Sequence, residues 1–140
     1  MEKVKTNLDF QDISQKLRNF RFPKVDLVIG IATGGTFPAI MIAHQLGLDC
    51  RFIHINFRDP SNEPVYPEPV LLSGNINDIP AGTKILLVDE VSVSGKTINK
   101  ALELLKNFDV KTFVLKGNGD YVLFPDVKTC VNWPWKLIGD

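Results

Sequence analysis

The stretch Ile85-Leu86-Leu87-Val88-Asp89-Glu90-Val91-Ser92-Val93-Ser94-Gly95-Lys96-Thr97 decides the fold that this sequence predicts. Its four bulky apolar residues lead directly into two adjacent carboxylates. An all-apolar run of this length is typical of a strand that is buried on both faces of a parallel sheet. Since open α/β sheets bind ligands at the carboxyl ends of their strands, Asp89 and Glu90 stand where a ligand is expected.

The residues after the acids predict a turn that binds phosphate. Residues 94–97 lead into a segment whose apolar residues recur at helical spacing. The first backbone N–H groups of a helix have no internal partner, and the helix dipole adds a partial positive charge there. The small residues of the turn would let a phosphate approach the main chain, and the hydroxyls of Ser94 and Thr97 would donate hydrogen bonds to it.

A second strand, turn and helix lie earlier in the chain. The buried-strand pattern of residues 27–31 ends in Thr33-Gly34-Gly35-Thr36, and a helical run follows over residues 39–46. The glycine pair would present consecutive backbone N–H groups to an anion, although the same pair also fits simple turn geometry. The helix is apolar nearly all round, so we expect it to pack between the sheet and another surface, such as a second subunit.

Three interpretations of the 85–97 stretch compete. A nucleotide triphosphatase loop, G-x-x-x-x-G-K-[ST], requires glycine where Glu90 stands, and carboxylates at its mouth would repel the phosphates. A plain strand, turn and helix with a surface acid pair is the alternative without a function. The hydrophobic strand, the two acids and the Ser-Gly-Lys-Thr turn closely resemble the phosphoribosyl pyrophosphate signature of the type I phosphoribosyltransferase family, nearest to its purine (xanthine–guanine and hypoxanthine) members.

The resemblance implies a role for each part of these motifs. Asp89 and Glu90 would be the catalytic pair that holds the ribose hydroxyls and favours positive charge on the sugar. The pyrophosphate would lie at Thr33, Gly34 and Gly35. The implied contacts of the 5′-phosphate are Val93, Ser94, Gly95, Lys96 and Thr97.

The resemblance also implies a base site near the carboxyl end of the chain. Residues 112–115 predict a strand that ends at Lys116, although a solvated lysine at a strand end is equally ordinary. A small hood over about residues 117–140 would finish in Pro134-Trp135, as in the xanthine–guanine type enzymes. The implied base contacts are Lys116, Cys130, Val131 and Trp133.

Three residues depart from the family pattern. Thr33 stands where an arginine or lysine usually precedes the glycines, Val93 where purine enzymes have an aspartate, and Cys130 where an aromatic residue stacks on the base. All three departures point toward lost catalysis. They keep open a second hypothesis, that the protein is a non-catalytic binder or sensor of phosphoribosyl pyrophosphate or a nucleotide.

The composition is that of an ordinary globular protein with one domain. Of 140 residues, 44% are hydrophobic and 23% charged, and 16 basic residues balance 16 acidic ones, so nothing in the charge favours nucleic acid or a membrane as a partner. Cys50 and Cys130 form neither a zinc pattern nor a disulfide framework, which together with the absence of an apolar signal core predicts a cytoplasmic protein.

The sequence therefore predicts a doubly wound α/β domain over residues 1–140, with a largely parallel sheet of four or five strands, flanking helices and the small hood. The function implied by the resemblance is transfer of a phosphoribosyl group from phosphoribosyl pyrophosphate to a nucleobase, in nucleotide salvage, with release of pyrophosphate. The resemblance further implies Mg²⁺, bound through the substrate and possibly through Asp89 and Glu90, and a homodimer. The proline-rich loop over residues 58–69 is either a lid that closes over the site or a passive connection.

Overall fold

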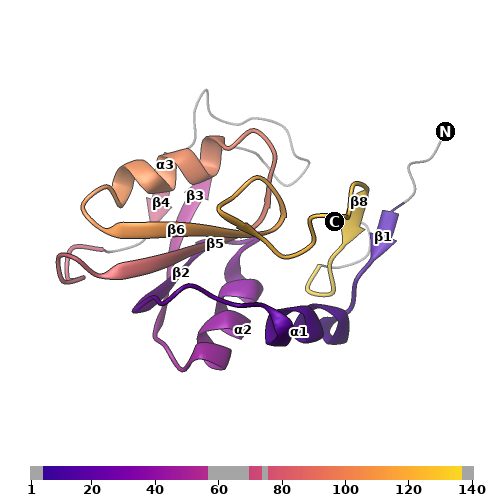
Figure 1. Cartoon of the computed structure of the whole chain (residues 1–140). Helices are drawn as coiled ribbons and strands as arrows, with labels where there is room; N and C mark the ends of the chain where they lie inside the picture. Colours follow the sequence, from indigo (N-terminus) through magenta and orange to yellow (C-terminus); the bar gives the residue numbers. More distant parts are fainter. Residues whose placement is uncertain (1–4, 57–69, 74–75, 137–140) are drawn as a thin grey trace.

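The computed structural model of the chain describes residues 5–56, 70–73 and 76–136 (Figure 1). The predicted loop over residues 58–69 lies outside the described residues. Within them, no helix is long and apolar enough to cross a membrane. The elements in chain order are β1 (Lys5–Asn7), α1 (Phe10–Asn19), β2 (Leu27–Ala32), α2 (Thr36–Leu46), β3 (Cys50–Asn56), β4 (Val70–Ser73), β5 (Lys84–Ser92), α3 (Lys96–Leu104), β6 (Asp109–Gly117), β7 (Tyr121–Val122) and β8 (Cys130–Asn132).

The main sheet has the strand order β4-β3-β2-β5-β6-β7. Every neighbouring pair is parallel except β3 and β4. Helix α3 covers one face, and α1 and α2 cover the other (Figure 1). The predicted doubly wound, mostly parallel sheet is confirmed. The described part of the sheet has six strands rather than four or five because the short β4 and β7, which carry little sequence pattern, extend its edges.

Strand β5 is buried on both faces, as its apolar run predicts. Leu86 and Val88 pack with the cluster that contains α1 and α2, whereas Ile85 and Leu87 pack with the cluster that contains α3. All four side chains are fully buried. Because successive side chains of a strand alternate between faces, one apolar run supports both layers and fixes the position of the residues that follow it.

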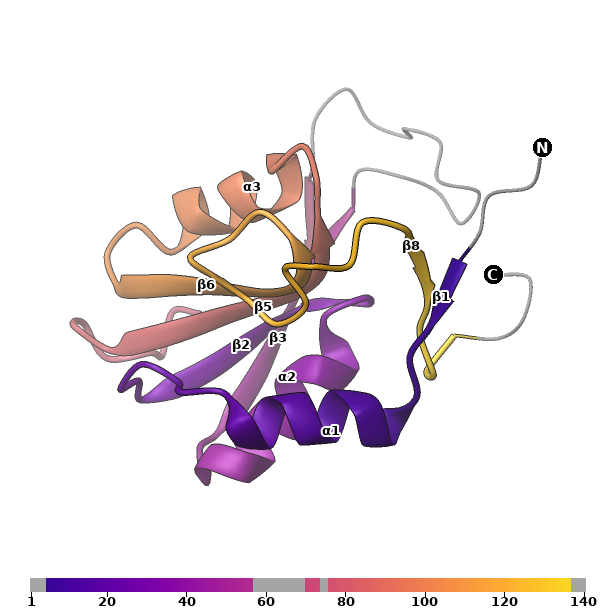
Figure 2. The same cartoon turned by 45° about the vertical axis from the view of Figure 1, so that its right-hand side comes forward.

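A second small sheet lies beside the carboxyl ends of β5 and β6 (Figure 2). In it β1 and β8 pair in parallel, and the Asn132 side-chain amide donates to Asn7 Oδ1 at 2.7 Å. The hood is smaller than expected, because residues 121–122 join the main sheet as β7. It also includes a strand from the other end of the chain, which no local sequence pattern indicated.

The loop between β2 and α2 packs directly on the main chain of β5. The Gly35 N–H donates to the Ile31 carbonyl oxygen at 2.8 Å. A methyl group added at Gly35 would lie 2.5 Å from the carbonyl oxygen of Val88 and 2.8 Å from that of Ile31. Only glycine fits this contact without displacement of the loop or the strand.

We predict that Gly35→Ala lowers the free energy of unfolding by about 1–3 kcal/mol, because the added methyl group overpacks the loop against β5. Gly34→Ala is the matched control: its methyl group would meet Glu90 Cβ at 3.3 Å, and we expect it to cost less than about 1 kcal/mol. Urea unfolding of the two variants measures the difference. Equal losses in the two variants would contradict this packing.

Candidate functional site

Two helices begin at the carboxyl edge of the sheet with open N-termini. The start of α1 is closed by a capping box, in which Asp12 N–H donates to Asp9 Oδ1 at 2.8 Å and Asp9 N–H to Asp12 Oδ2 at 3.0 Å. Helices α2 and α3 instead follow Gly35 and Gly95, which have no side chain to cap them. The Thr36 N–H donates to the Thr33 carbonyl oxygen at 3.1 Å and the Lys96 N–H to Ser94 Oγ at 3.4 Å, so an anion at either helix start would bind the N–H groups that follow or replace these contacts.

The turn before α3 has the accessibility that phosphate binding requires. Gly95 adopts a left-handed conformation with φ of 78°, and the Val93 side chain is 77% exposed, so packed apolar groups do not block the turn. Asn118 supports it from β6: its N–H donates to the Ser92 carbonyl oxygen at 2.8 Å and its side-chain amide to the Val93 carbonyl oxygen at 3.2 Å. No local pattern in the sequence indicated this role of Asn118.

A hollow of about 300 Å³ adjoins the turn on the side of α3 and β6. Asp89, Glu90 and Gly34 do not line it, so it lies beside the acid pair rather than over it. Its lining residues are Ser92, Val93, Ser94, Gly95, Ile98, Asn99, Leu102, Thr112, Asn118, Gly119 and Asp120.

Gly34 connects the first loop to both acids. A Cβ atom at Gly34 would lie 3.6 Å from Glu90 Oε2 and 3.7 Å from Asp89 Oδ1. The peptide bond that enters this loop, between Ala32 and Thr33, is cis. The structure thus brings the loop over residues 33–35 and the predicted acid pair to the same end of β5.

The Asp89 carboxyl group is partly withdrawn from water. The pKa of Asp89 is raised to about 7, chiefly by this desolvation and also by the negative charge of Glu90, whereas the hydrogen bond from the Glu90 N–H and the charge of Lys136 act in the opposite direction. The Glu90 N–H donates to Asp89 Oδ1 at 2.8 Å. An acid with a pKa near neutral pH changes its charge easily when a ligand or a cation arrives.

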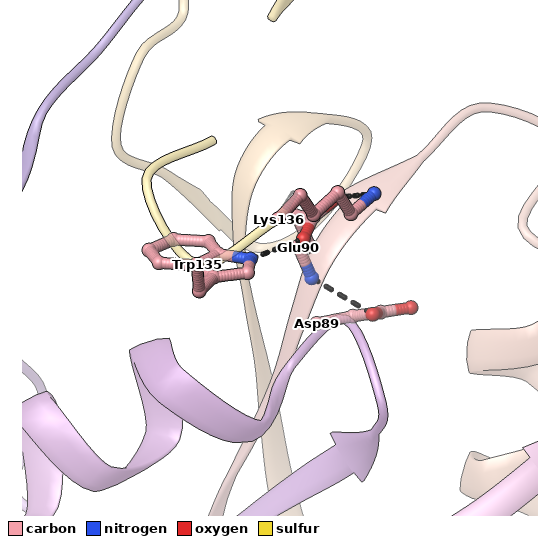
Figure 3. A network of polar contacts seen from close by, with 4 residues as sticks. All are labelled: Asp89, Glu90, Trp135 and Lys136. Atoms are coloured by element: carbon pink, nitrogen blue, oxygen red, sulfur yellow. Dashed lines mark hydrogen bonds and ion pairs between the residues drawn. The ribbon is translucent and has the colours of Figure 1, made fainter. Parts of the chain in front are cut away.

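The Glu90 carboxylate is held by two residues near the end of the described chain (Figure 3). Trp135 Nε1–H donates to Oε2 at 2.7 Å, and Lys136 Nζ donates to Oε1 at 2.8 Å. The Glu90 side chain is 7% exposed as a result. Sequence reasoning placed Trp135 in the hood but assigned neither residue to the site, because no spacing in the sequence signals a contact across 45 positions.

The predicted base contacts lie in different surroundings. Lys116 is half-buried next to Val91, at the carboxyl end of β6. Cys130 is exposed and Val131 half-buried, both in β8. Trp133 is 4% exposed and stacks on Trp135, with ring centroids 5.5 Å apart and planes within 6°. The structure therefore places Trp133 inside an aromatic stack, and its contact with a base stays a prediction.

The described residues contain no group of three or more histidine, cysteine or acidic side chains that could hold a metal ion. Asp89 is the available carboxylate at the end of β5, since both oxygens of Glu90 accept hydrogen bonds from Trp135 and Lys136. Asp89 suits a cation, because a partly dehydrated carboxylate gains from a neighbouring positive charge. This carboxylate fits Mg²⁺, which prefers oxygen ligands.

The model of the phosphoribosyl transferase domain family matches residues 9–139, and the chain belongs to this family. The resemblance found in the sequence is thereby confirmed. Among solved structures, a purine phosphoribosyltransferase from Pyrococcus horikoshii is 25% identical, with a TM-score of 0.70 over 95% of this chain and 94% of that one. A xanthine–guanine–hypoxanthine phosphoribosyltransferase from Helicobacter pylori, 16% identical with a TM-score of 0.73 over 94% of each chain, shows the same fold.

Other relatives include proteins that are not described as enzymes. A hypothetical protein from Neisseria gonorrhoeae, solved with bound ppGpp, is 27% identical with a TM-score of 0.73 over 99% of this chain and 93% of that one. The transcriptional regulator GfcR of Archaeoglobus fulgidus is 32% identical over 62% of this chain, and the orotate phosphoribosyltransferase of Sulfurisphaera tokodaii 30% identical over 66%. The chain spans about two fifths of the length of these two curated relatives, 43% and 40%.

We predict that ionisation of Asp89 lowers the free energy of unfolding as pH rises from about 4 to about 7. In this range the unfolded chain releases the Asp89 proton at its ordinary pKa of 3.8, whereas the folded protein keeps it until about pH 7. Asp89→Asn should remove this loss and be more stable than the wild type at pH 8 by roughly 2–4 kcal/mol.

Urea unfolding of both proteins at several pH values measures the difference. The two stability curves should converge below about pH 3, where Asp89 is largely protonated in both states. A constant difference between them from pH 3 to 8 would show that the pKa of Asp89 is not raised.

Proposed function

We propose that this chain transfers a phosphoribosyl group from phosphoribosyl pyrophosphate to a purine-like nucleobase, with release of pyrophosphate, in nucleotide salvage. The observation that carries the proposal is the meeting of three elements at the end of β5: the acid pair, the uncapped start of α3 and the loop over residues 33–35. A ribose that bears a phosphate at one end and a pyrophosphate at the other needs an anion site on either side of a group that accepts hydrogen bonds from its diol.

In this proposal the N–H groups that open α3 and the hydroxyls of Ser94 and Thr97 bind the 5′-phosphate. Thr33, Gly34 and Gly35 bind the pyrophosphate. Asp89 and Glu90 accept hydrogen bonds from the ribose hydroxyls, and their negative charge stabilises a sugar that becomes positive as its bond to pyrophosphate breaks. The chain thus acts by orientation and electrostatics, without a covalent intermediate.

Mg²⁺ would be held by oxygens of pyrophosphate and ribose, with Asp89 as the available protein ligand. When bound, it neutralises charge on the leaving pyrophosphate. The main-chain N–H groups of the 33–35 loop would add to that neutralisation, which matters more here because Thr33 lacks the positive charge that the family usually has.

A purine-like acceptor is supported by the likeness to the Pyrococcus horikoshii purine enzyme over nearly the whole chain. Lys116 would donate to an exocyclic oxygen of the base, and the main chain of Val131 would contact the base edge. Cys130 and Trp133 would border the base, although Trp133 would first have to leave its stack on Trp135.

A second candidate function is binding of phosphoribosyl pyrophosphate or a nucleotide without turnover. Two observations favour it: Glu90 is already held by Trp135 and Lys136, and the similar Neisseria gonorrhoeae protein contains ppGpp. The regulators among the relatives point the same way. In this case the α3 turn and the acid pair would still bind the ribose phosphate.

We also expect the protein to form a homodimer. Large apolar side chains are exposed on α1, α2 and β3, which supports an interface on this side of the sheet. They are Phe10, Phe37, Ile40 and Phe52, each 38–47% exposed.

One assay separates the two candidate functions. The protein is incubated with Mg²⁺, phosphoribosyl pyrophosphate and each of a panel of purine and pyrimidine bases, and both thermal stabilisation and pyrophosphate release are measured. The enzyme hypothesis predicts release with at least one purine. Stabilisation by phosphoribosyl pyrophosphate without release on any base supports the binder, and no stabilisation at all contradicts both.

We predict that Asp89→Asn together with Glu90→Gln weakens binding of phosphoribosyl pyrophosphate at least tenfold, because two charged acceptors for the diol are lost, each worth about 1.5–3 kcal/mol. The fold should persist, since both replacements keep the shape of the side chain. Calorimetric titration and circular dichroism check the two statements. Unchanged affinity in a folded variant would remove the acids from the site.

A further inference from the structure

The carboxylate that the proposed function assigns to the ribose diol is already occupied in this structure. Each Glu90 oxygen accepts a short hydrogen bond, one from the Trp135 indole and one from the Lys136 ammonium group (Figure 3). Both donors come from the segment after β8, which belongs to the hood and not to the main sheet.

This contact competes with a ligand for the same atoms. The Glu90 side chain is 7% exposed, so its oxygens face protein donors rather than water. A ribose diol must bring its hydroxyl groups within hydrogen-bond distance of those oxygens, where Trp135 Nε1 and Lys136 Nζ already lie at 2.7 Å and 2.8 Å. Because the carboxylate is nearly buried, a diol that reaches both oxygens has to displace these donors.

An aromatic stack anchors the competing segment. The Trp135 ring lies between Trp133, at 5.5 Å with planes 6° apart, and Phe37, at 5.9 Å with planes 13° apart. Phe10 packs against it as well, at 6.0 Å. Because Phe37 is in the first turn of α2, the stack joins the hood to the helix that begins at the predicted pyrophosphate loop.

We propose that Trp135 and Lys136 form a latch that closes Glu90 in the ligand-free protein, and that a ribose phosphate binds by displacing this latch. The inference rests on the proposed function for the identity of the ligand. It adds that only the open form, in which Trp135 and Lys136 have left Glu90, binds the diol fully. The apparent affinity is therefore the affinity of the open form multiplied by the fraction of molecules that are open.

The test uses ribose 5-phosphate and the variant Trp135→Phe. Phenylalanine keeps an aromatic ring for the stack but loses the indole donor, so it weakens the latch and leaves Asp89, Glu90 and the α3 turn in place. We expect Trp135→Phe to bind ribose 5-phosphate at least about tenfold more tightly than the wild type, the effect of losing one hydrogen bond to a charged acceptor. Equal or weaker binding by the folded variant would overturn the latch, because a segment that positions Glu90 for the ligand gives that result.

A second measurement follows the latch directly. The chain has two tryptophans, so the amide NMR spectrum of labelled protein contains two indole N–H signals, and Trp135→Phe identifies one of them. In ligand-free protein, Glu90→Gln should shift the Trp135 signal. Lys128→Gln is the control: this lysine donates to the Pro125 carbonyl oxygen, and its replacement should leave the Trp135 signal unmoved. Saturation of the wild type with ribose 5-phosphate should shift the Trp135 signal in the same direction as Glu90→Gln.

The outcomes distinguish the latch from the proposed function. Binding of ribose 5-phosphate with an unmoved Trp135 signal would refute the latch and leave the function standing. Binding by neither the wild type nor Trp135→Phe would refute the proposed function, and the latch with it. Binding by Trp135→Phe alone would support both.

Discussion

The site depends on the rigid carboxyl end of β5. The four apolar residues before Asp89 are buried against helices on both faces of the sheet, so the acids that follow them cannot shift without disruption of the core. Three separate segments pack onto this strand end. Gly35 lies on the Val88 carbonyl group, Asn118 holds the start of the turn before α3, and the hood reaches Glu90. The geometry of the site is therefore set by packing on one strand.

The negative charge of the two acids is reduced in this structure. Carboxylates next to a phosphate site repel the ligand unless their charge is reduced. The pKa of Asp89 is raised to about 7, chiefly by desolvation, so this group is partly protonated at neutral pH, and the ammonium group of Lys136 offsets the charge of Glu90. The ligand-free site thus presents less than two full negative charges beside the N-terminus of α3. Arrival of a sugar diol and a cation would favour the ionised form of both acids.

The sequence predicted what local pattern determines. The buried strand, the acid pair, the glycine turns and the parallel sheet follow from periodicity and spacing along short stretches. What it did not predict depends on the path of the chain through space. The contact of Trp135 and Lys136 with Glu90 and the pairing of β1 with β8 join distant segments, and β7 is too short to carry a pattern. The burial of Trp133 in a stack, where a base contact was expected, has the same cause.

The central claim is that the open start of α3 binds a sugar phosphate beside the acid pair. Backbone amide signals test it most directly during titration of labelled protein with ribose 5-phosphate. The account predicts large shifts for the N–H groups of residues 95–98 and of Glu90, with no change at the start of α1, whose N–H groups are closed by its capping box. Shifts confined to other parts of the chain, or equal shifts at the two helix starts, would contradict it.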